Sequence, residues 1–141
     1  MLAIISMSVC IFIVIMNFIS VVIMARKCKS RPRTLSVPTD APAVSIIRPL
    51  RGVEQFSEET LEASFSLNYP KYELVFCVQS ASDAVIDLVQ ATSRKHPHVD
   101  CTILIGDDVI SANPKLNNCV KGWDNAKYDY VILADSNALM P

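Results

Sequence analysis

The sequence predicts an α/β protein in which an N-terminal transmembrane helix precedes a mostly parallel β-sheet. Apolar residues make up 51% of the 141 residues, but they are concentrated in residues 1–25, where only four positions are polar. Beyond residue 42, short apolar runs typical of strands alternate with segments of helical periodicity, which is the pattern of repeated βαβ units. The lengths of the two parts predict one membrane segment and roughly one small domain.

The first segment, residues 1–25, has no charged side chain after the amino terminus. A helix of this length is about 36 Å long, enough to cross a hydrocarbon core of about 30 Å. Its 14 Leu, Ile, Val and Phe residues favour insertion by about 4–8 kcal/mol. A cleaved signal peptide is the alternative, but the apolar run is long, no basic residue precedes it and no small-residue cleavage pattern ends it. We therefore expect an uncleaved membrane anchor.

A basic segment follows the anchor, with five Lys and Arg residues between residues 26 and 33. The positive-inside rule places such a cluster on the cytoplasmic side. We therefore expect the domain to face the cytosol, at the Golgi or ER in a eukaryote or at the inner membrane in a bacterium. Five cysteines without a CxxC pair agree with a reducing compartment. Residues 26–42 are expected to form a basic juxtamembrane segment and linker, and residues 43–141 the domain.

The first strand of the domain is expected at residues 43–50, and the first helix at residues 57–67. Ser57 is a suitable N-cap, and two glutamates follow it in the first turn, where the helix dipole favours negative charge. Phe56 can pack against Leu61 across this turn as a hydrophobic staple.

The second strand is expected at residues 72–79, a nearly continuous apolar run typical of a strand buried on both faces. The next helix is expected at residues 82–95, capped by Ser82. Its inward face is predicted from apolar residues at helical spacing, namely Val85, Ile86, Leu88 and Val89.

The third and fourth strands are expected at residues 101–105 and 130–134. Between them, Asn113 and Pro114 have the pattern of an N-cap followed by proline at the first helical position. Apolar residues recur after this cap at helical spacing and predict a helix: Leu116, Cys119, Val120 and Trp123.

Ligands of parallel sheets bind outside the carboxyl ends of the strands. In this sequence that rule points to Arg51, Asp83, Lys115 and Asp135. Asp135, together with Asn137, could offer oxygen atoms to a divalent cation that holds a diphosphate, or it could simply cap a turn. Asp83 could accept hydrogen bonds from a base or ribose, or could favour the adjoining helix N-terminus.

Lys115 is expected in the first turn of its helix, where a positive charge opposes the helix dipole by about 0.3–1 kcal/mol. An anionic phosphate at that helix end would explain the placement, and a solvated lysine is the alternative.

Other classes of site are disfavoured. Only three glycines are present, which excludes a P-loop and the G-x-G-x-x-G fingerprint. There is no G-x-S-x-G elbow for a serine hydrolase. His96 and His98 lack metal-ligand spacing and are expected to be surface residues. A net charge of −6 over residues 34–141 argues against nucleic-acid binding.

Five blocks of sequence carry a family resemblance between residues 43 and 138. They are RPLRGV at residues 48–53, NYPKYE at 68–73, CVQ at 77–79 with Asp83, NPKLNN at 113–118 and KYDYVILADSN at 127–137. In this order and spacing, they closely resemble the ceramide glucosyltransferases.

The resemblance implies a GT-A fold, with residues 43–141 as its nucleotide-binding half. It implies transfer of glucose from UDP-glucose to ceramide with inversion, with a Mg²⁺ or Mn²⁺ ion at the diphosphate. Asp83 resembles the family aspartate that contacts the nucleotide, and Asp135 the one at the diphosphate and metal. Lys115 and Asn117 belong to the block that lies beside the donor.

Two departures from the family pattern matter. Asn137 stands where related transferases have the second carboxylate of Asp-x-Asp, so weaker metal binding is expected. The resemblance places the catalytic base and a Gln/Arg-x-x-Arg-Trp motif beyond Pro141, so we expect an amino-terminal fragment that is inactive alone. Two alternatives stay open: a glycosyltransferase with another lipid or polysaccharide acceptor, and a membrane-anchored fragment that binds nucleotide without turnover.

Overall fold

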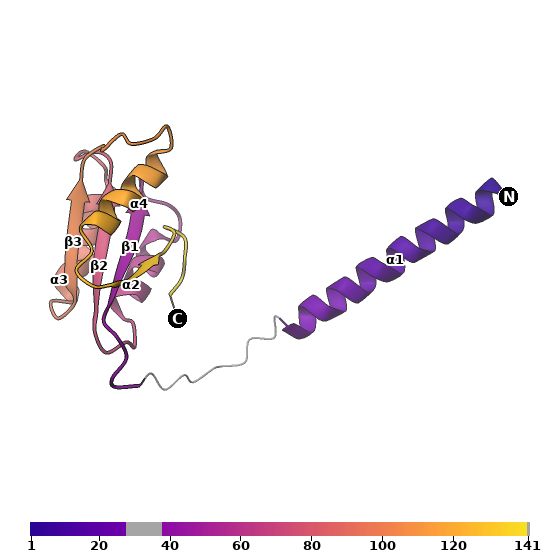
Figure 1. The fold of residues 1–141 in the computed structure, drawn as a ribbon, viewed down its shortest axis with the longest axis horizontal. Coiled ribbons are helices and arrows are strands. Elements are labelled where there is room, and N and C mark those ends of the chain that lie inside the picture. Colours follow the sequence, from indigo (N-terminus) through magenta and orange to yellow (C-terminus); the bar gives the residue numbers. More distant parts are fainter. Residues whose placement is uncertain (28–37, 141) are drawn as a thin grey trace. The chain divides into compact units, whose positions relative to one another are not determined.

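The structure is a computed structural model that describes residues 1–27 and 38–140, and it divides near residue 36 into two compact units (Figure 1). The described part of the first unit is one helix, α1 (Leu2–Lys27), and the second unit is an α/β domain. Most of the expected basic segment and linker, residues 28–37 with Cys28, lies outside the described residues.

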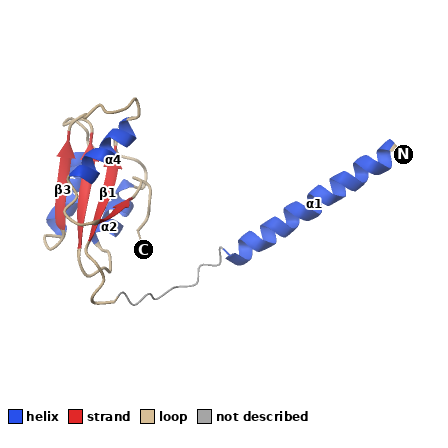
Figure 2. Ribbon diagram, viewed as in Figure 1, coloured by secondary structure: helices blue, strands red, loops and turns tan. Residues whose placement is uncertain are grey.

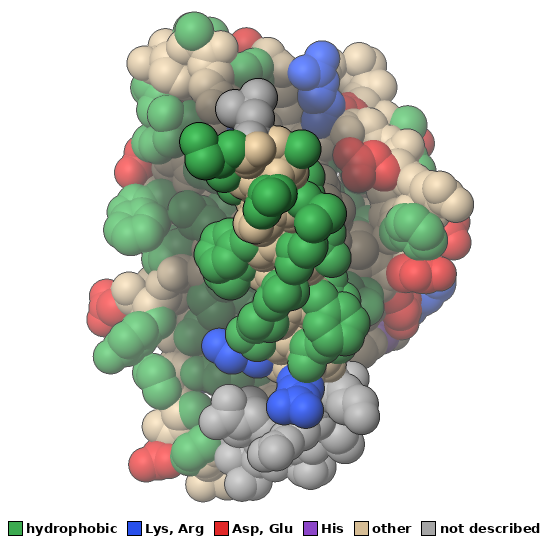
Figure 3. Space-filling view, turned by 90° about the vertical axis from the view of Figure 1, so that its right-hand side faces the viewer, with side chains coloured by type: hydrophobic (Ala, Val, Ile, Leu, Met, Phe, Trp, Pro, Cys, Tyr) green, Lys and Arg blue, Asp and Glu red, His purple; other side chains and the backbone are tan. Residues whose placement is uncertain are grey.

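Helix α1 is long and apolar enough to span a membrane, judged by its length and composition. Its surface is almost entirely hydrophobic, and Arg26 and Lys27 lie in its last turn (Figure 3). Ser6, Ser8 and Asn17 within it bond to the helix's own backbone; Ser8 Oγ donates to the Ile4 carbonyl at 3.0 Å and Asn17 Nδ2 to the Ile13 carbonyl at 2.9 Å. Such bonds satisfy polar groups without water, as a lipid environment requires.

The domain has the expected order of strands and helices (Figure 2). The elements are β1 (Val44–Leu50), α2 (Ser57–Phe65), β2 (Tyr72–Val78), α3 (Val85–Lys95), β3 (Asp100–Ile105), α4 (Pro114–Asp124) and β4 (Tyr130–Leu133). All strand pairs are parallel, and the strand order is β3-β2-β1-β4. The predicted mostly parallel α/β sheet is confirmed.

Strand β1 lies at the centre of this order, and Val44 pairs with Tyr72 of β2 and Tyr130 of β4. The chain builds outward from β1 through β2 to β3, and then crosses to the other side of β1 to add β4. The carboxyl ends of β1 and β4 therefore meet at the point where the strand order reverses, which is where ligands of such sheets bind.

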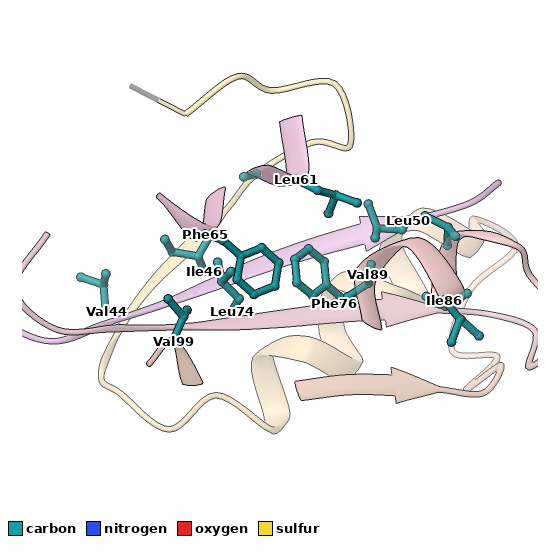
Figure 4. Packing of buried hydrophobic residues seen from close by; sticks show 13 residues of the cluster. Val44, Ile46, Leu50, Leu61, Phe65, Leu74, Phe76, Ile86, Val89 and Val99 are labelled. Carbon is teal, nitrogen blue, oxygen red and sulfur yellow. The ribbon is translucent and has the colours of Figure 1, made fainter. Parts of the chain in front are cut away.

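Helices α2 and α3 cover one face of the sheet over the main hydrophobic cluster (Figure 4). At its centre, the rings of Phe65 and Phe76 stack with centroids 5.8 Å apart. The predicted inward residues of α3 are confirmed, since Val85, Ile86 and Val89 are buried and Leu88 is partly buried against the cluster.

The opposite face of the sheet, which α4 covers, carries a buried polar network near the amino ends of the strands. Glu73 is 5% exposed, and its Oε1 accepts hydrogen bonds from Ser45 Oγ at 2.5 Å and from the Lys127 backbone N–H at 2.6 Å. Ser45 Oγ accepts in turn from the Tyr128 N–H at 3.0 Å. The network ties the segment before β4 to β1 and β2, and so helps to set the register of β4.

Two expected helix caps are wrong. Phe56 rather than Ser57 is the N-cap of α2, and its side chain has no polar atom for a cap bond; the Ser57 hydroxyl accepts from the Glu54 N–H at 2.7 Å. Phe56 is itself exposed rather than stapled into the core. At the start of α3, Asp83 rather than Ser82 accepts from the helix, at the Val85 N–H.

The predicted helix is present as α4, but its apolar residues do not form the side that faces the sheet, and Cys119 and Val120 are only half-buried. Leu116 and Trp123 are 48% and 58% exposed. The side that packs on the sheet consists of polar and small residues instead, namely Asn117, Asn118, Lys121 and Gly122. The physical reason is close approach: a Cβ atom on Gly122 would lie 2.4 Å from Ile47 Cγ2 and 2.9 Å from Cys77 Sγ.

His96 is less exposed than expected. Its Nε2 lies 2.7 Å from Glu62 Oε1, and its ring stacks on Phe65 at a centroid distance of 5.6 Å. The ring therefore links the end of α3 to α2, whereas His98 is exposed as expected.

Candidate functional site

A hollow of about 140 Å³ lies where the carboxyl ends of β1 and β4 meet the first turn of α4. Its walls come from three segments that are distant in sequence: Pro49 and Leu50 at the end of β1 with Arg51 and Glu54 after it, Lys115 and Asn118 of α4, and Ser136 after β4. Two of the four residues expected at the carboxyl edge, Arg51 and Lys115, line this hollow, and the third, Asp135, directly precedes Ser136.

Lys115 and Asp135 form an ion pair at the mouth of this region. Lys115 Nζ lies 2.5 Å from Asp135 Oδ1, and the two side chains are 57% and 58% exposed. The hydrogen bond to Asp135 raises the pKa of the Lys115 ammonium. Because both groups are exposed, the pair adds little stability, and both charges remain accessible to a ligand.

The first turn of α4 holds Lys115 in place. Asn113 Oδ1 accepts hydrogen bonds from the N–H groups of Lys115 at 3.0 Å and Leu116 at 3.4 Å, and Pro114 occupies the first helical position. The predicted cap is confirmed. It fixes the helix end, whose partial positive charge favours an anion.

Asp83 lies at the start of α3 and uses its carboxylate on the backbone. Both oxygens accept from the Gly52 N–H, at 3.0 and 2.9 Å, and Oδ1 also accepts from the Val85 N–H at 3.0 Å. Gly52 has a φ of +67°, which glycine adopts without strain. Asp83 thus fixes the loop that carries Arg51. Its contact with a nucleotide stays a prediction.

Asn117 is 4% exposed, and its side-chain amide bonds to Ser111. Its Oδ1 accepts from the Ser111 N–H and hydroxyl, each at 2.9 Å, and its Nδ2 donates to the Ser111 carbonyl at 3.1 Å. The structure therefore places Asn117 where it shapes the loop between β3 and α4.

Two buried cationic side chains, Arg48 and Lys121, lie beneath the exposed residues of the site, one on each face of the sheet. Arg48 of β1 is fully buried, and its Nη2 donates to the carbonyls of Asp135, Ser136 and Ala138 at 2.9, 2.9 and 3.0 Å. Lys121 of α4 is 9% exposed, and its Nζ donates to the carbonyls at the ends of β2 and β3, Val78 at 3.2 Å and Gly106 at 2.5 Å.

The residues after β4 fit a divalent cation only if a ligand completes its coordination. Among the described residues, no group of three His, Cys, Asp or Glu side chains could hold a metal ion. Asp135 and Asn137, one carboxylate and one amide on an exposed turn, suit an ion such as Mg²⁺, which takes one or two carboxylates and completes its shell with phosphate oxygens and water.

Sequence reasoning missed Arg48, Lys121 and Ser136. A charged residue inside an apolar strand run was the available signal for Arg48, since such a residue is buried only with bonded partners. No comparable signal marks Lys121, because it lies on the side of α4 that its polar composition predicts to face solvent.

Comparison with known proteins places the chain among glycosyltransferases. The family model described as glycosyl transferase family 21 matches residues 9–141. A ceramide glucosyltransferase from Komagataella phaffii is 42% identical over 112 residues, which cover 77% of this chain and 22% of that protein. Ceramide glucosyltransferase 3 of Caenorhabditis elegans is 35% identical over 99 residues, which cover 70% and 22%. The chain thus spans about a fifth of the length of these relatives.

Solved structures support the GT-A fold. A mannosyltransferase from Pyrobaculum calidifontis, PcManGT in complex with GDP-Man and Mn²⁺, superposes with a TM-score of 0.59 at 22% identity over 83% of this chain and 34% of its own. TarS of S. aureus, residues 1–349, superposes with a TM-score of 0.54 at 20% identity over 67% and 27%.

Proposed function

The chain belongs to glycosyl transferase family 21, and on this basis we propose that the full-length protein transfers glucose from UDP-glucose to ceramide at a membrane. The names of its relatives support ceramide as the acceptor and glucose as the transferred sugar. The complex of the mannosyltransferase with GDP-Man and Mn²⁺ supports a nucleotide-sugar donor and a divalent cation. Helix α1 with its terminal Arg26 and Lys27 supports a membrane anchor with a cytosolic domain.

The observation that carries this proposal is the meeting of Arg51, Lys115 and Asp135 at the point where the strand order reverses. Arg51 and Lys115 supply positive charge to a diphosphate, and the N-terminus of α4 adds its dipole. Asp83, at the end of the neighbouring strand, is proposed to contact the nucleoside while it holds the Gly52 loop.

Asp135 and Asn137 are the residues proposed to hold the cation. The ion neutralises charge on the departing diphosphate when it is bound. Inversion also needs a base that takes the proton of the ceramide hydroxyl, and the family resemblance places that base beyond Pro141.

The test is an assay of the full-length protein in membranes of a host that makes no glucosylceramide, with UDP-glucose and ceramide. Asp135→Asn is expected to lower kcat/KM by about 10²–10³-fold, the usual loss when a group that stabilises developing charge is removed. Asp124→Asn, at an exposed position at the end of α4, is the matched control and should retain activity.

Three outcomes would contradict the proposal. Folded wild-type protein that makes no glucosylceramide would exclude the reaction. Faster transfer to another lipid or to a polysaccharide would exclude ceramide as the acceptor. Equal activity of Asp135→Asn and Asp124→Asn would exclude the proposed role of Asp135.

A further inference from the structure

Arg48 is the largest fully buried side chain of the described domain, and it carries a charge. Its Nη1 donates to the Thr60 carbonyl at 2.9 Å and to the Ser64 hydroxyl, both in α2. Its Nη2 faces three carbonyls of the turn after β4. The two halves of one rigid, planar guanidinium therefore hold two separate segments of the chain.

Stability alone does not account for this arginine. None of the ion pairs among the described residues includes Arg48. Its Nε has no hydrogen-bond partner among these residues. Burial lowers the pKa of its guanidinium. A buried charge without an opposite charge is unfavourable by several kcal/mol, and an apolar residue of similar volume is often more stabilising. Ile46 and Leu50, two residues before and after Arg48 on β1, belong to the hydrophobic cluster, whereas the guanidinium itself donates to four carbonyls and the Ser64 hydroxyl.

The turn after β4 is bonded to Arg48 through three of its carbonyls. The three carbonyls at residues 135, 136 and 138 converge on Nη2, which has only two hydrogens to share among them. The turn's own backbone bond, from the Ala138 N–H to the Asp135 carbonyl at 3.0 Å, shares one of these acceptors. The buried Arg48 thus holds the backbone carbonyl of Asp135, while the Asp135 carboxylate stays exposed beside Lys115.

The same guanidinium joins the two walls of a second hollow, of about 370 Å³. One wall is the start of α2 with Thr60, and the other is the turn with Ser136 and Asn137. Because Arg48 bonds both to Thr60 and to this turn, it sets the distance between the walls.

We propose that Arg48 is a positioning residue for the reaction proposed above: its guanidinium holds the turn at residues 135–138 and so aims Asp135 and Asn137 at the donor diphosphate and its cation. The inference rests on the proposed function, although the hold on the turn is testable without turnover.

The test compares Arg48→Lys with Ser64→Ala in the purified full-length protein in detergent. Lysine keeps the charge but is a point donor that cannot hold both segments. Ser64→Ala removes a partner of Arg48 on α2 and leaves the turn untouched, so it is the matched control. The first measurement is hydrogen exchange of the peptide that covers residues 134–140, without ligands, and the second is the kinetics with UDP-glucose and Mn²⁺.

We expect faster exchange in residues 134–140 for Arg48→Lys only. We also expect its half-saturating Mn²⁺ concentration and its KM for UDP-glucose to rise about tenfold, the usual effect of losing a residue that orients a metal ligand. Ser64→Ala should keep both constants within about twofold. If Arg48→Lys does not accumulate, Arg48→Met, which fills similar space, takes its place with the same expectations.

Unchanged exchange and unchanged constants in a folded Arg48 variant would overturn the proposal. Ser64→Ala would overturn it as well if it changed the exchange of residues 134–140 and both constants as much as Arg48→Lys does, because this result would show a general packing effect. A wild-type protein without glucosyl transfer contradicts the proposed function instead, and the exchange measurement then still decides whether Arg48 holds the turn.

Discussion

Individual residues bring cationic side chains to the carboxyl edge of the sheet, where Glu54 and Asp135 also lie. The sequence from residue 34 onward carries a net charge of −6, yet Arg51 and Lys115 line one hollow, with Arg48 and Lys121 buried behind the site. The local arrangement of charges, more than their total, determines what a cleft attracts.

Cys77 offers a residue-scale prediction about pH. It is fully buried on β2, and burial raises the pKa of its thiol from 9.0 to about 11. The folded state therefore holds this proton more tightly than the unfolded state. The stabilisation is complete below about pH 9 and is lost as the pH rises through about 11, an effect on the order of 2 kcal/mol.

The measurement is the free energy of unfolding by urea between pH 8 and pH 11. Wild type should lose stability over this range more steeply than Cys77→Ala. The alanine variant is less stable at every pH because it leaves a cavity, so the slope is the quantity to compare. Parallel curves for the two proteins would contradict the prediction.

At the scale of elements, α4 shows how tertiary contacts override helical periodicity. The apolar residues of α4 do not form its buried side, because the helix packs closely on β1 and β2 through Gly122. Its buried lysine is tolerated because Lys121 Nζ donates to the carbonyls that end β2 and β3. Leu116 and Trp123 consequently remain on the outer side.

Adjacent residues of α4 test this orientation. Gly122→Ala introduces a methyl group where Ile47 and Cys77 already lie, and overpacking of this kind destabilises by about 1–3 kcal/mol. Trp123→Gln changes an exposed side chain, and the expected change is within about 0.5 kcal/mol. Thermal unfolding of the full-length protein in detergent measures both changes in stability. A larger destabilisation by Trp123→Gln than by Gly122→Ala would show that the tryptophan faces the core.

The strands and most of the candidate site were predictable from sequence because their signals are local. Continuous apolar runs predict β1 and β2, and the rule that ligands bind at carboxyl ends points to Arg51, Lys115 and Asp135. The caps of α2 and α3 were not predictable, because several polar residues compete for each helix start and the path of the preceding loop selects one. Asp83 caps α3 while its carboxylate also accepts from Gly52.

On the scale of the whole molecule, α1 and the α/β domain are separate units with different physical requirements. The exposed apolar surface of α1 is unfavourable in water and favourable in lipid. The double substitution of Ile13 and Ile15 by arginine should oppose insertion by about 5–7 kcal/mol, since each arginine near the centre of a span contributes about 2.5–3.5 kcal/mol.

Carbonate extraction of membranes checks this prediction. Wild type should stay with the membrane pellet, and the double arginine variant should move largely to the supernatant. Ser6→Ala combined with Ser8→Ala, which keeps the segment apolar, is the control and should stay with the pellet. Retention of the arginine variant would show that other parts of the protein hold it at the membrane.

The sequence by itself determined the apolar span, the alternation of strands and helices and the family, because each depends on local composition or on short colinear motifs. Only the tertiary structure decided which face of α4 is buried, that Lys115 pairs with Asp135, and that Arg48 holds the turn after β4. Residues 48 and 135 meet because β1 and β4 are neighbours in the sheet. Such contacts depend on strand order and on the space between packed elements, which no local pattern of residues records.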